Sequence, residues 1–175
     1  MRKLTVGAVV LTTLMIGGCF TIPVTPDMMR ESARSSSFGR EETVHVQRPF
    51  DAVVSSIAQR APTCLRGGVR VTTTQGNAAT GITTSTRNVY YTPKLVRKGN
   101  RAELYIQQMV KGTILVGENK DKIPPEGWYI MVVDIIPAAS GGTQLKFYRT
   151  FNLDIVATAI TQWAKNTGSG CPDLT

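Results

Sequence analysis

Residues 127–136, GWYIMVVDII, and residues 153–164, LDIVATAITQWA, carry the two hydrophobic patterns that decide the fold. In the first segment the side chains from Trp128 to Val133 are all apolar or aromatic, although successive side chains of a strand point to opposite faces. This predicts a strand buried on both faces. The second segment places apolar residues on one face of a helix, namely Leu153, Val156, Ala157, Ile160, Trp163 and Ala164.

Similar patterns flank these two segments. A second amphipathic stripe between Phe50 and Ala61 predicts a helix that begins after Pro49 and ends at Pro62. We expect the last helix to begin near Asn152, as an N-cap, and to end before Gly168. Strand patterns separated by turn signals cover Thr43–Gln47, Val69–Thr74, Ala79–Tyr91, Arg101–Val116, Gly127–Ile136 and Thr143–Phe151, with turns at Gly76-Asn77, Gly99-Asn100, Pro124-Pro125 and Gly141-Gly142.

The order of these elements predicts one α+β domain over residues 41–175. Its expected form is β-α-β(4–6)-α, an antiparallel sheet of about five to six strands with two helices packed on one face. This order is similar to the helix-grip and TBP-like architectures. The similarity concerns topology and does not imply a function.

Composition excludes several classes of protein. The chain has 175 residues, 42% of them hydrophobic and 18% charged, which is typical of a globular domain and not of a disordered or multi-span membrane protein. Twenty Lys and Arg against twelve Asp and Glu give a net charge of +8, which favours anionic partners.

The first twenty residues predict where the protein is sent. Arg2 and Lys3 precede an apolar stretch over residues 4–16 that is too short for a membrane-spanning helix, which is the pattern of a signal peptide. The following Ile16-Gly17-Gly18-Cys19 resembles the lipobox of bacterial lipoproteins. The resemblance implies removal of residues 1–18 and acylation of Cys19. The alternative is an ordinary secretory signal followed by a chance cysteine.

The lipoprotein resemblance also implies a location. Phe20 stands where an Asp commonly signals retention in the inner membrane, so we expect an outer-membrane anchor with the domain in the periplasm. Residues 19–40 contain Pro and Ser without sustained periodicity and predict a flexible tether, although residues 28–37 are compatible with a weak helix. Twenty residues of flexible coil would span about 25 Å.

Two further cysteines predict a disulfide. Cys64 follows the first predicted helix and Cys171 follows the last, and an exported domain meets an oxidising compartment. The alternative is that both thiols are buried and free. A Cys64–Cys171 bridge would hold the C-terminal tail beside the end of the first predicted helix.

The sequence offers no recognisable catalytic or metal-binding constellation. His45 is the single histidine, so neither a Ser-His-Asp relay nor a His-based metal site can be assembled, and we expect it to be structural. The carboxylates Glu41, Glu42, Asp134 and Asp154 are expected on solvated faces, and no phosphate-binding glycine motif is present. We therefore expect no enzyme activity, no metal and no cofactor.

Two loops are candidates for docking. Lys94, Arg97, Lys98 and Arg101 lie in and around a predicted turn that follows Tyr90 and Tyr91, where they would attract lipid head groups or an acidic protein. The alternative is a solvated loop. The segment over residues 120–128, KDKIPPEGW, predicts a stiff exposed loop and is the second candidate.

Three function classes follow from these patterns. The first is a lipid-anchored cell-envelope protein that acts as a non-enzymatic binding or assembly module, with an envelope protein or anionic lipid as partner and no nucleic acid. The second is a carrier or sensor of an apolar ligand held between the sheet and the C-terminal helix, near Ile160 and Trp163. The third is an enzyme acting on peptidoglycan or lipid, which the missing nucleophile and base disfavour.

Overall fold

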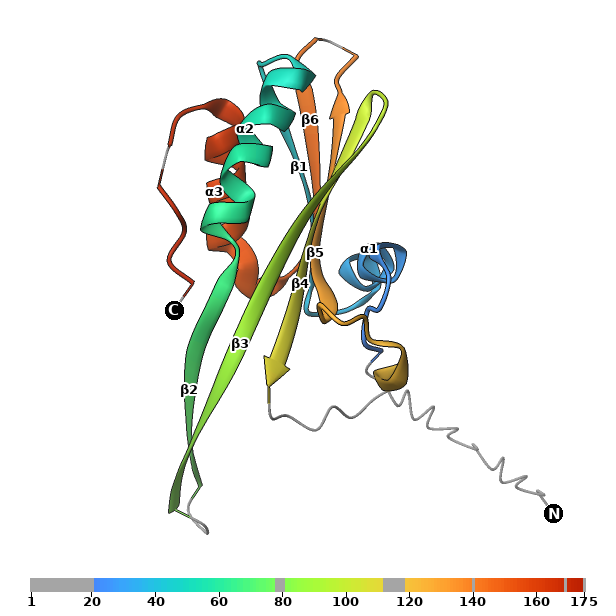
Figure 1. The fold of residues 1–175 in the computed structure, drawn as a ribbon. Helices are drawn as coiled ribbons and strands as arrows, with labels where there is room; N and C mark the ends of the chain where they lie inside the picture. The colour runs from blue at the N-terminus through green and yellow to red at the C-terminus, as the bar shows by residue number, and fades with distance from the viewer. Residues whose placement is uncertain (1–20, 78–80, 112–118, 140, 169, 175) are drawn as a thin grey trace, which may run out of the picture.

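The computed structural model describes residues 21–174 except 78–80, 112–118, 140 and 169. Its centre is a six-stranded antiparallel sheet with the order β1-β6-β5-β4-β3-β2, shown in Figure 1. The predicted α+β class and antiparallel sheet are confirmed. The strands are β1 (Gly39–Val46), β2 (Gly67–Asn77), β3 (Gly81–Lys98), β4 (Arg101–Lys111), β5 (Trp128–Pro137) and β6 (Thr143–Thr150).

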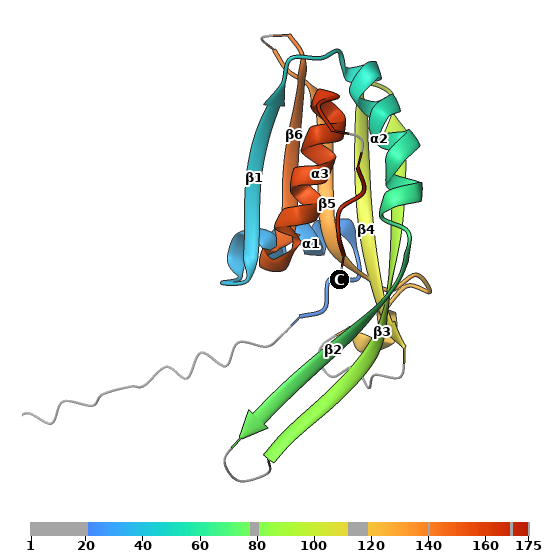
Figure 2. The same ribbon diagram turned by 90° about the vertical axis from the view of Figure 1, so that its left-hand side faces the viewer.

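Helices cover both faces of this sheet. On one face lie α2 (Phe50–Cys64) and α3 (Asp154–Lys165), whereas α1 (Pro26–Ser35) lies on the opposite face (Figures 1 and 2). Two single-turn helices, η1 (Lys120–Lys122) and η2 (Phe151–Leu153), precede β5 and α3. The two predicted helices, α2 and α3, share one face, but the expected form with two helices alone is not confirmed, because a third helix packs on the other face.

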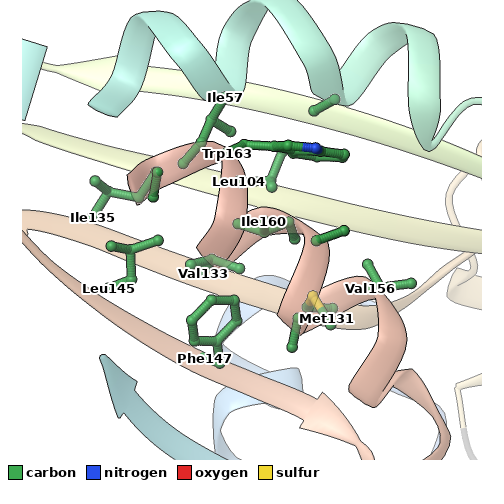
Figure 3. Packing of buried hydrophobic residues seen from close by; sticks show 14 of the residues in the cluster. Ile57, Leu104, Met131, Val133, Ile135, Leu145, Phe147, Val156, Ile160 and Trp163 are labelled. Atoms are coloured by element: carbon green, nitrogen blue, oxygen red, sulfur yellow. The ribbon is translucent and has the colours of Figure 1, made fainter. Parts of the chain in front are cut away.

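The main core lies between the sheet and the pair α2 and α3. Figure 3 shows how Ile57 of α2 and Ile160 and Trp163 of α3 meet side chains of the central strands. Met131 and Val133 of β5 face this core, while Val132 belongs to the cluster on the α1 side, and all three are fully buried. The prediction that this strand is buried on both faces is confirmed.

Within the segment predicted as a flexible tether, residues 19–40, the structure places helix α1 over Pro26–Ser35. The Thr25 side chain caps the helix by accepting a hydrogen bond of 3.2 Å from the Met28 backbone N–H, and Pro26 occupies the first turn. Met29 and Ala33 are buried against the sheet. The sequence pattern was weak because only these two positions supply the buried contact of an otherwise polar helix.

Several predicted boundaries also shift. Pro62 does not end α2, which continues to Cys64, because Leu65 donates its N–H to the Ala61 carbonyl at 2.9 Å and keeps the last turn closed. Residues 76 and 77, predicted as a turn, belong to β2. Asn152 does not cap α3, since its side chain accepts a hydrogen bond from the Thr150 hydroxyl.

The predicted disulfide between Cys64 and Cys171 is present. It joins the end of α2 to the C-terminal tail across a sequence separation of 107 residues. The Trp163 indole N–H donates to the Gly170 carbonyl at 3.1 Å, and Leu174 packs against the main core. The tail is therefore part of the folded domain.

Candidate functional site

The N-terminal segment before α1 is tied to the end of the sheet at which β5 begins. Ile22 is buried, and the Pro23 carbonyl accepts a hydrogen bond of 2.9 Å from the Tyr129 backbone N–H. Together with α1 this segment forms a groove of about 520 Å³. The groove is lined by Thr21, Pro23, Met28, Met29, Glu31, Ser32, Ser35, Ser36, Ser37, Phe38, Gly39, Trp128, Tyr129, Ile130 and Thr150.

The groove has the size and chemistry of a site for a small apolar ligand. Its volume lies within the range of about 300–1,000 Å³ that is usual for such sites. Its lining includes two methionines and three aromatic residues, together with four serines. At its margin the Phe38 side chain is 66% exposed, and its ring centroid lies 5.8 Å from that of Phe151, which is also exposed.

Ion pairs hold α1 against the sheet. The Arg30 guanidinium contacts Glu103 at 2.6 Å and Asp134 at 2.5 Å, and it also reaches Asp27 at the start of its own helix. Glu103 and Asp134 are register partners on the adjacent strands β4 and β5. Arg30 therefore bridges two carboxylates that would otherwise repel each other.

Hydrogen bonding also sets the protonation of Glu103. Burial raises its pKa, but hydrogen bonds from Tyr105 and Arg30 outweigh that effect and bring the pKa below the usual 4.5. Burial and the hydrogen bond to Glu103 raise the pKa of the Tyr105 hydroxyl, which donates to Glu103 at 2.5 Å. At neutral pH Glu103 is thus an ionised acceptor whose role here is to hold α1.

A second set of charges fixes the end of α1. Arg34 and Lys146 contact the two oxygens of Glu41 at 2.8 and 2.7 Å, and hydrogen bonds from Lys146 and Arg34 hold the pKa of Glu41 below its usual value. The Arg34 guanidinium also lies 4.9 Å from the centre of the Tyr148 ring. These contacts add ion pairs and a cation–π contact to the buried packing of Met29 and Ala33.

The predicted docking residues Lys94, Arg97, Lys98 and Arg101 gather at the β3–β4 turn. Arg97 contacts Asp51 at the start of α2 at 2.5 Å and lies over the Phe50 ring, and Lys98 contacts Glu103 at 3.3 Å. The turn lies at the end of the sheet opposite the groove (Figure 1).

The predicted loop over residues 120–128 leads directly into the groove. The Gln107 amide donates to the Gly127 carbonyl at 2.9 Å, and Gly127 has φ of 101°. A Cβ at Gly127 would lie 2.0 Å from the Gln108 carbonyl oxygen, so a side chain would displace the loop. The loop thereby positions Trp128 as a groove residue.

The remaining predicted positions do not join this site. His45 is exposed on β1, opposite Gln144 of β6. Cys19 and the rest of the lipobox-like stretch lie outside the described residues. Between the sheet and α3, Ile160 and Trp163 are fully buried, and the pocket lined by Leu65, Tyr91, Ile106, Ile130, Leu153, Val156 and Leu174 measures about 10 Å³.

The described part of the chain holds neither a cluster of metal ligands nor a membrane-spanning helix. Across residues 21–174, leaving out the gaps given above, no three His, Cys, Asp or Glu residues form a group that could hold a metal ion. In the same residues no helix has the length and hydropathy needed to cross a membrane.

The two edges of the sheet differ. Edge strand β1 has 8 residues, carries Arg40, Glu41 and Glu42, and is contacted by α1. Edge strand β2 has 11 residues with Arg70 as its single charged residue, and within the described residues it pairs with β3 alone. Its residues 71–77 pair with residues 81–87, and among the residues that the structure describes β4 pairs with β3 only from Asn88 onward, so this stretch forms the arm in Figures 1 and 2.

Sequence reasoning missed both the groove and the difference between the edges. The Thr25-Pro26 pair is a helix-start signal that pointed to α1, whereas the groove depends on contacts between residues about a hundred positions apart. No protein-family model matches the chain, and no curated protein matches it. The residues themselves therefore carry the functional argument.

Proposed function

We propose that this is a lipid-anchored cell-envelope protein, acylated on Cys19, that acts as a non-enzymatic binding or assembly module in the periplasm. Support for export comes from the signal-like residues 1–18 and from the Cys64–Cys171 disulfide, since disulfides persist in oxidising compartments. Outer-membrane attachment follows from the lipobox resemblance together with Phe20.

The observation that carries the binding role is the edge of β2. An edge strand presents a row of backbone N–H and C=O groups that can pair with another chain. Natural proteins usually protect such edges with charge, proline, a bulge or a covering element. Residues 67–77 contain neither proline nor more than one charge, and Val71 is 40% exposed.

We propose that the partner adds an extended strand to β2. In this mode the backbone hydrogen bonds supply affinity, and the alternate side chains supply specificity. The arm formed with β3 lengthens the available edge beyond the body of the domain. The basic β3–β4 turn, with Lys94 and Arg101, adds electrostatic attraction for an acidic partner at the other end of β3.

Site-specific photo-crosslinking in intact cells tests this proposal. A photoreactive amino acid at Thr72, which is exposed on β2, is expected to capture a discrete partner. The same amino acid at Thr43, exposed on the other edge strand β1, is the matched control. Equal capture from both positions, or none from Thr72, would contradict docking at β2.

Anchoring is tested separately. Wild-type protein is expected to take up labelled fatty acid and to fractionate with membranes, whereas Cys19→Ser is expected to do neither. If the wild type takes up no label, the lipoprotein part of the proposal is wrong. The crosslinking result at Thr72 does not depend on this outcome.

A further inference from the structure

We propose that the groove beside α1 binds one acyl chain of the lipid attached to Cys19. The inference rests on the proposed acylation for the source of the chain. It adds a ligand site and a ligand class that the anchoring role does not require, because an anchor alone needs only the bilayer.

The course of the chain places the lipid next to the groove. Thr21 lines the groove, and the backbone from Thr21 to Pro23 is held at the end of β5 by the Tyr129 hydrogen bond. Cys19 precedes Thr21 by two residues, which span at most about 7 Å. An acyl chain on Cys19 is longer than this interval, so it can reach the groove without unfolding the segment.

The chemistry of the wall favours a neutral, linear, apolar ligand. Met28 offers a flexible thioether side chain that adapts to a chain of variable shape, and Met29 is fully buried beneath it. Tyr129 supplies aromatic surface on the α1 side of the facing strand, while Trp128 borders the groove and packs against the main core. Among the described residues that line the groove, Glu31 alone carries a charge, and this negative charge disfavours a free fatty-acid anion. Acyl chains linked to a cysteine carry no such anion.

The groove would stabilise the protein when its acyl chain is outside the bilayer. Moving an acyl chain from a bilayer into an apolar groove gains little, because both environments are apolar. Moving it from water into the groove removes apolar surface from water and is favourable. The groove therefore covers one chain during passage between two membranes, which the proposed outer-membrane location requires.

Intrinsic fluorescence provides the test, because Trp128 borders the groove and is only partly buried, whereas Trp163 is fully buried in the main core. The first experiment uses the chain from residue 19 onward with Cys19→Ser, titrated with a bromine-labelled monoacylglycerol, a neutral quencher. Quenching of the tryptophan emission is expected to saturate at one equivalent of the monoacylglycerol. The corresponding fatty-acid anion should bind at least tenfold more weakly. Trp128→Phe should show no quenching. Unsaturable or equal quenching in these samples would overturn the inference.

Blocking variants locate the site. Ser32→Phe places a ring inside the groove and is expected to weaken quenching at least tenfold, as is Ser36→Phe, with melting temperature as the folding check. Ser55→Phe, exposed on α2, is the control and should leave quenching unchanged. If quenching survives in folded Ser32→Phe and Ser36→Phe, the groove is not the binding site.

A second experiment asks whether the chain on Cys19 is the occupant. Cells fed a brominated fatty acid would yield acylated protein whose Trp128 emission is quenched, and Ser32→Phe should restore that emission. If mass spectrometry shows brominated chains on Cys19 while Trp128 emission is unchanged, the inference fails and the anchoring proposal stands. If Cys19 carries no acyl chain, the anchoring proposal fails, and the first experiment still decides whether the groove binds acyl chains.

Discussion

Arg30 Nη2 of α1 lies 2.6 Å from Glu103 Oε1 of β4, although 73 residues separate the two in sequence. Because Glu103 lies opposite Asp134 across the strand pair, this one guanidinium bridges two neighbouring carboxylates, and Lys98 adds a second positive charge at Glu103. Removal of Arg30 leaves Asp134 without this partner beside Glu103, which keeps its contacts with Lys98 and Tyr105. Helix α1 thus relies on this arginine as well as on the buried side chains of Met29 and Ala33.

Arg30→Ala is expected to lower the free energy of unfolding by about 2–3 kcal/mol, because partly buried carboxylates lose their partner. Arg30→Lys should lie between the wild type and alanine, since an ammonium cannot form the same forked contact. Urea denaturation measures both. Arg66→Ala, an exposed arginine at the end of α2, is the control and should change stability by less than about 0.5 kcal/mol.

Acid is expected to weaken the attachment of α1. The pKa values of Glu41 and Glu103 are lower in the folded protein than their usual 4.5, so their contribution is complete above that pH and is lost as pH falls through the folded values. Unfolding free energy measured between pH 7 and pH 3 should therefore decline at the acidic end. A double variant, Glu41→Gln with Glu103→Gln, should show a shallower decline, and an identical slope would contradict this assignment.

The disulfide is expected to contribute about 2–4 kcal/mol to stability, because it closes a long loop in the unfolded chain. Peptide mapping without reductant should recover Cys64 linked to Cys171, and the double variant Cys64→Ser with Cys171→Ser should melt at a lower temperature. If an alkylating reagent modifies both cysteines in the native protein without reductant, the disulfide is absent and the prediction is wrong.

Reversing the charges at the β3–β4 turn separates docking from stability. Lys94→Glu, Arg97→Glu and Lys98→Glu together should cost no more than about 1–2 kcal/mol, because the ion pairs of Arg97 and Lys98 are exposed. Complementation of a deletion strain is nevertheless expected to fall, since an acidic partner would be repelled. Full complementation by this variant would remove the turn from the docking surface.

The parts of the fold that could be predicted have strong local patterns. The stripes of α2 and α3 repeat apolar residues at a regular period, and the doubly buried β5 is an unbroken apolar run. Both patterns are visible within one segment. The Cys64–Cys171 pair followed from counting cysteines in an exported chain.

The parts that could not be predicted depend on pairing between distant residues. Helix α1 has two buried side chains. Its other contacts with the sheet are made by Arg30 and Arg34, which reach Glu103 of β4, Asp134 of β5, Glu41 of β1 and Tyr148 of β6. Local periodicity carries no information about such partners. The groove follows from α1 and was therefore missed with it.

The hydrogen bond between Tyr129 and Pro23 has a consequence for orientation. In a chain acylated at Cys19, a link of two residues leaves the domain few directions in which to turn relative to the bilayer, unlike a tether of twenty. The β3–β4 turn, at the opposite end of the sheet from this link, would then point into the periplasm in nearly every molecule. A partner would meet a surface already aligned, and binding would lose less rotational entropy than it would with a freely tumbling domain.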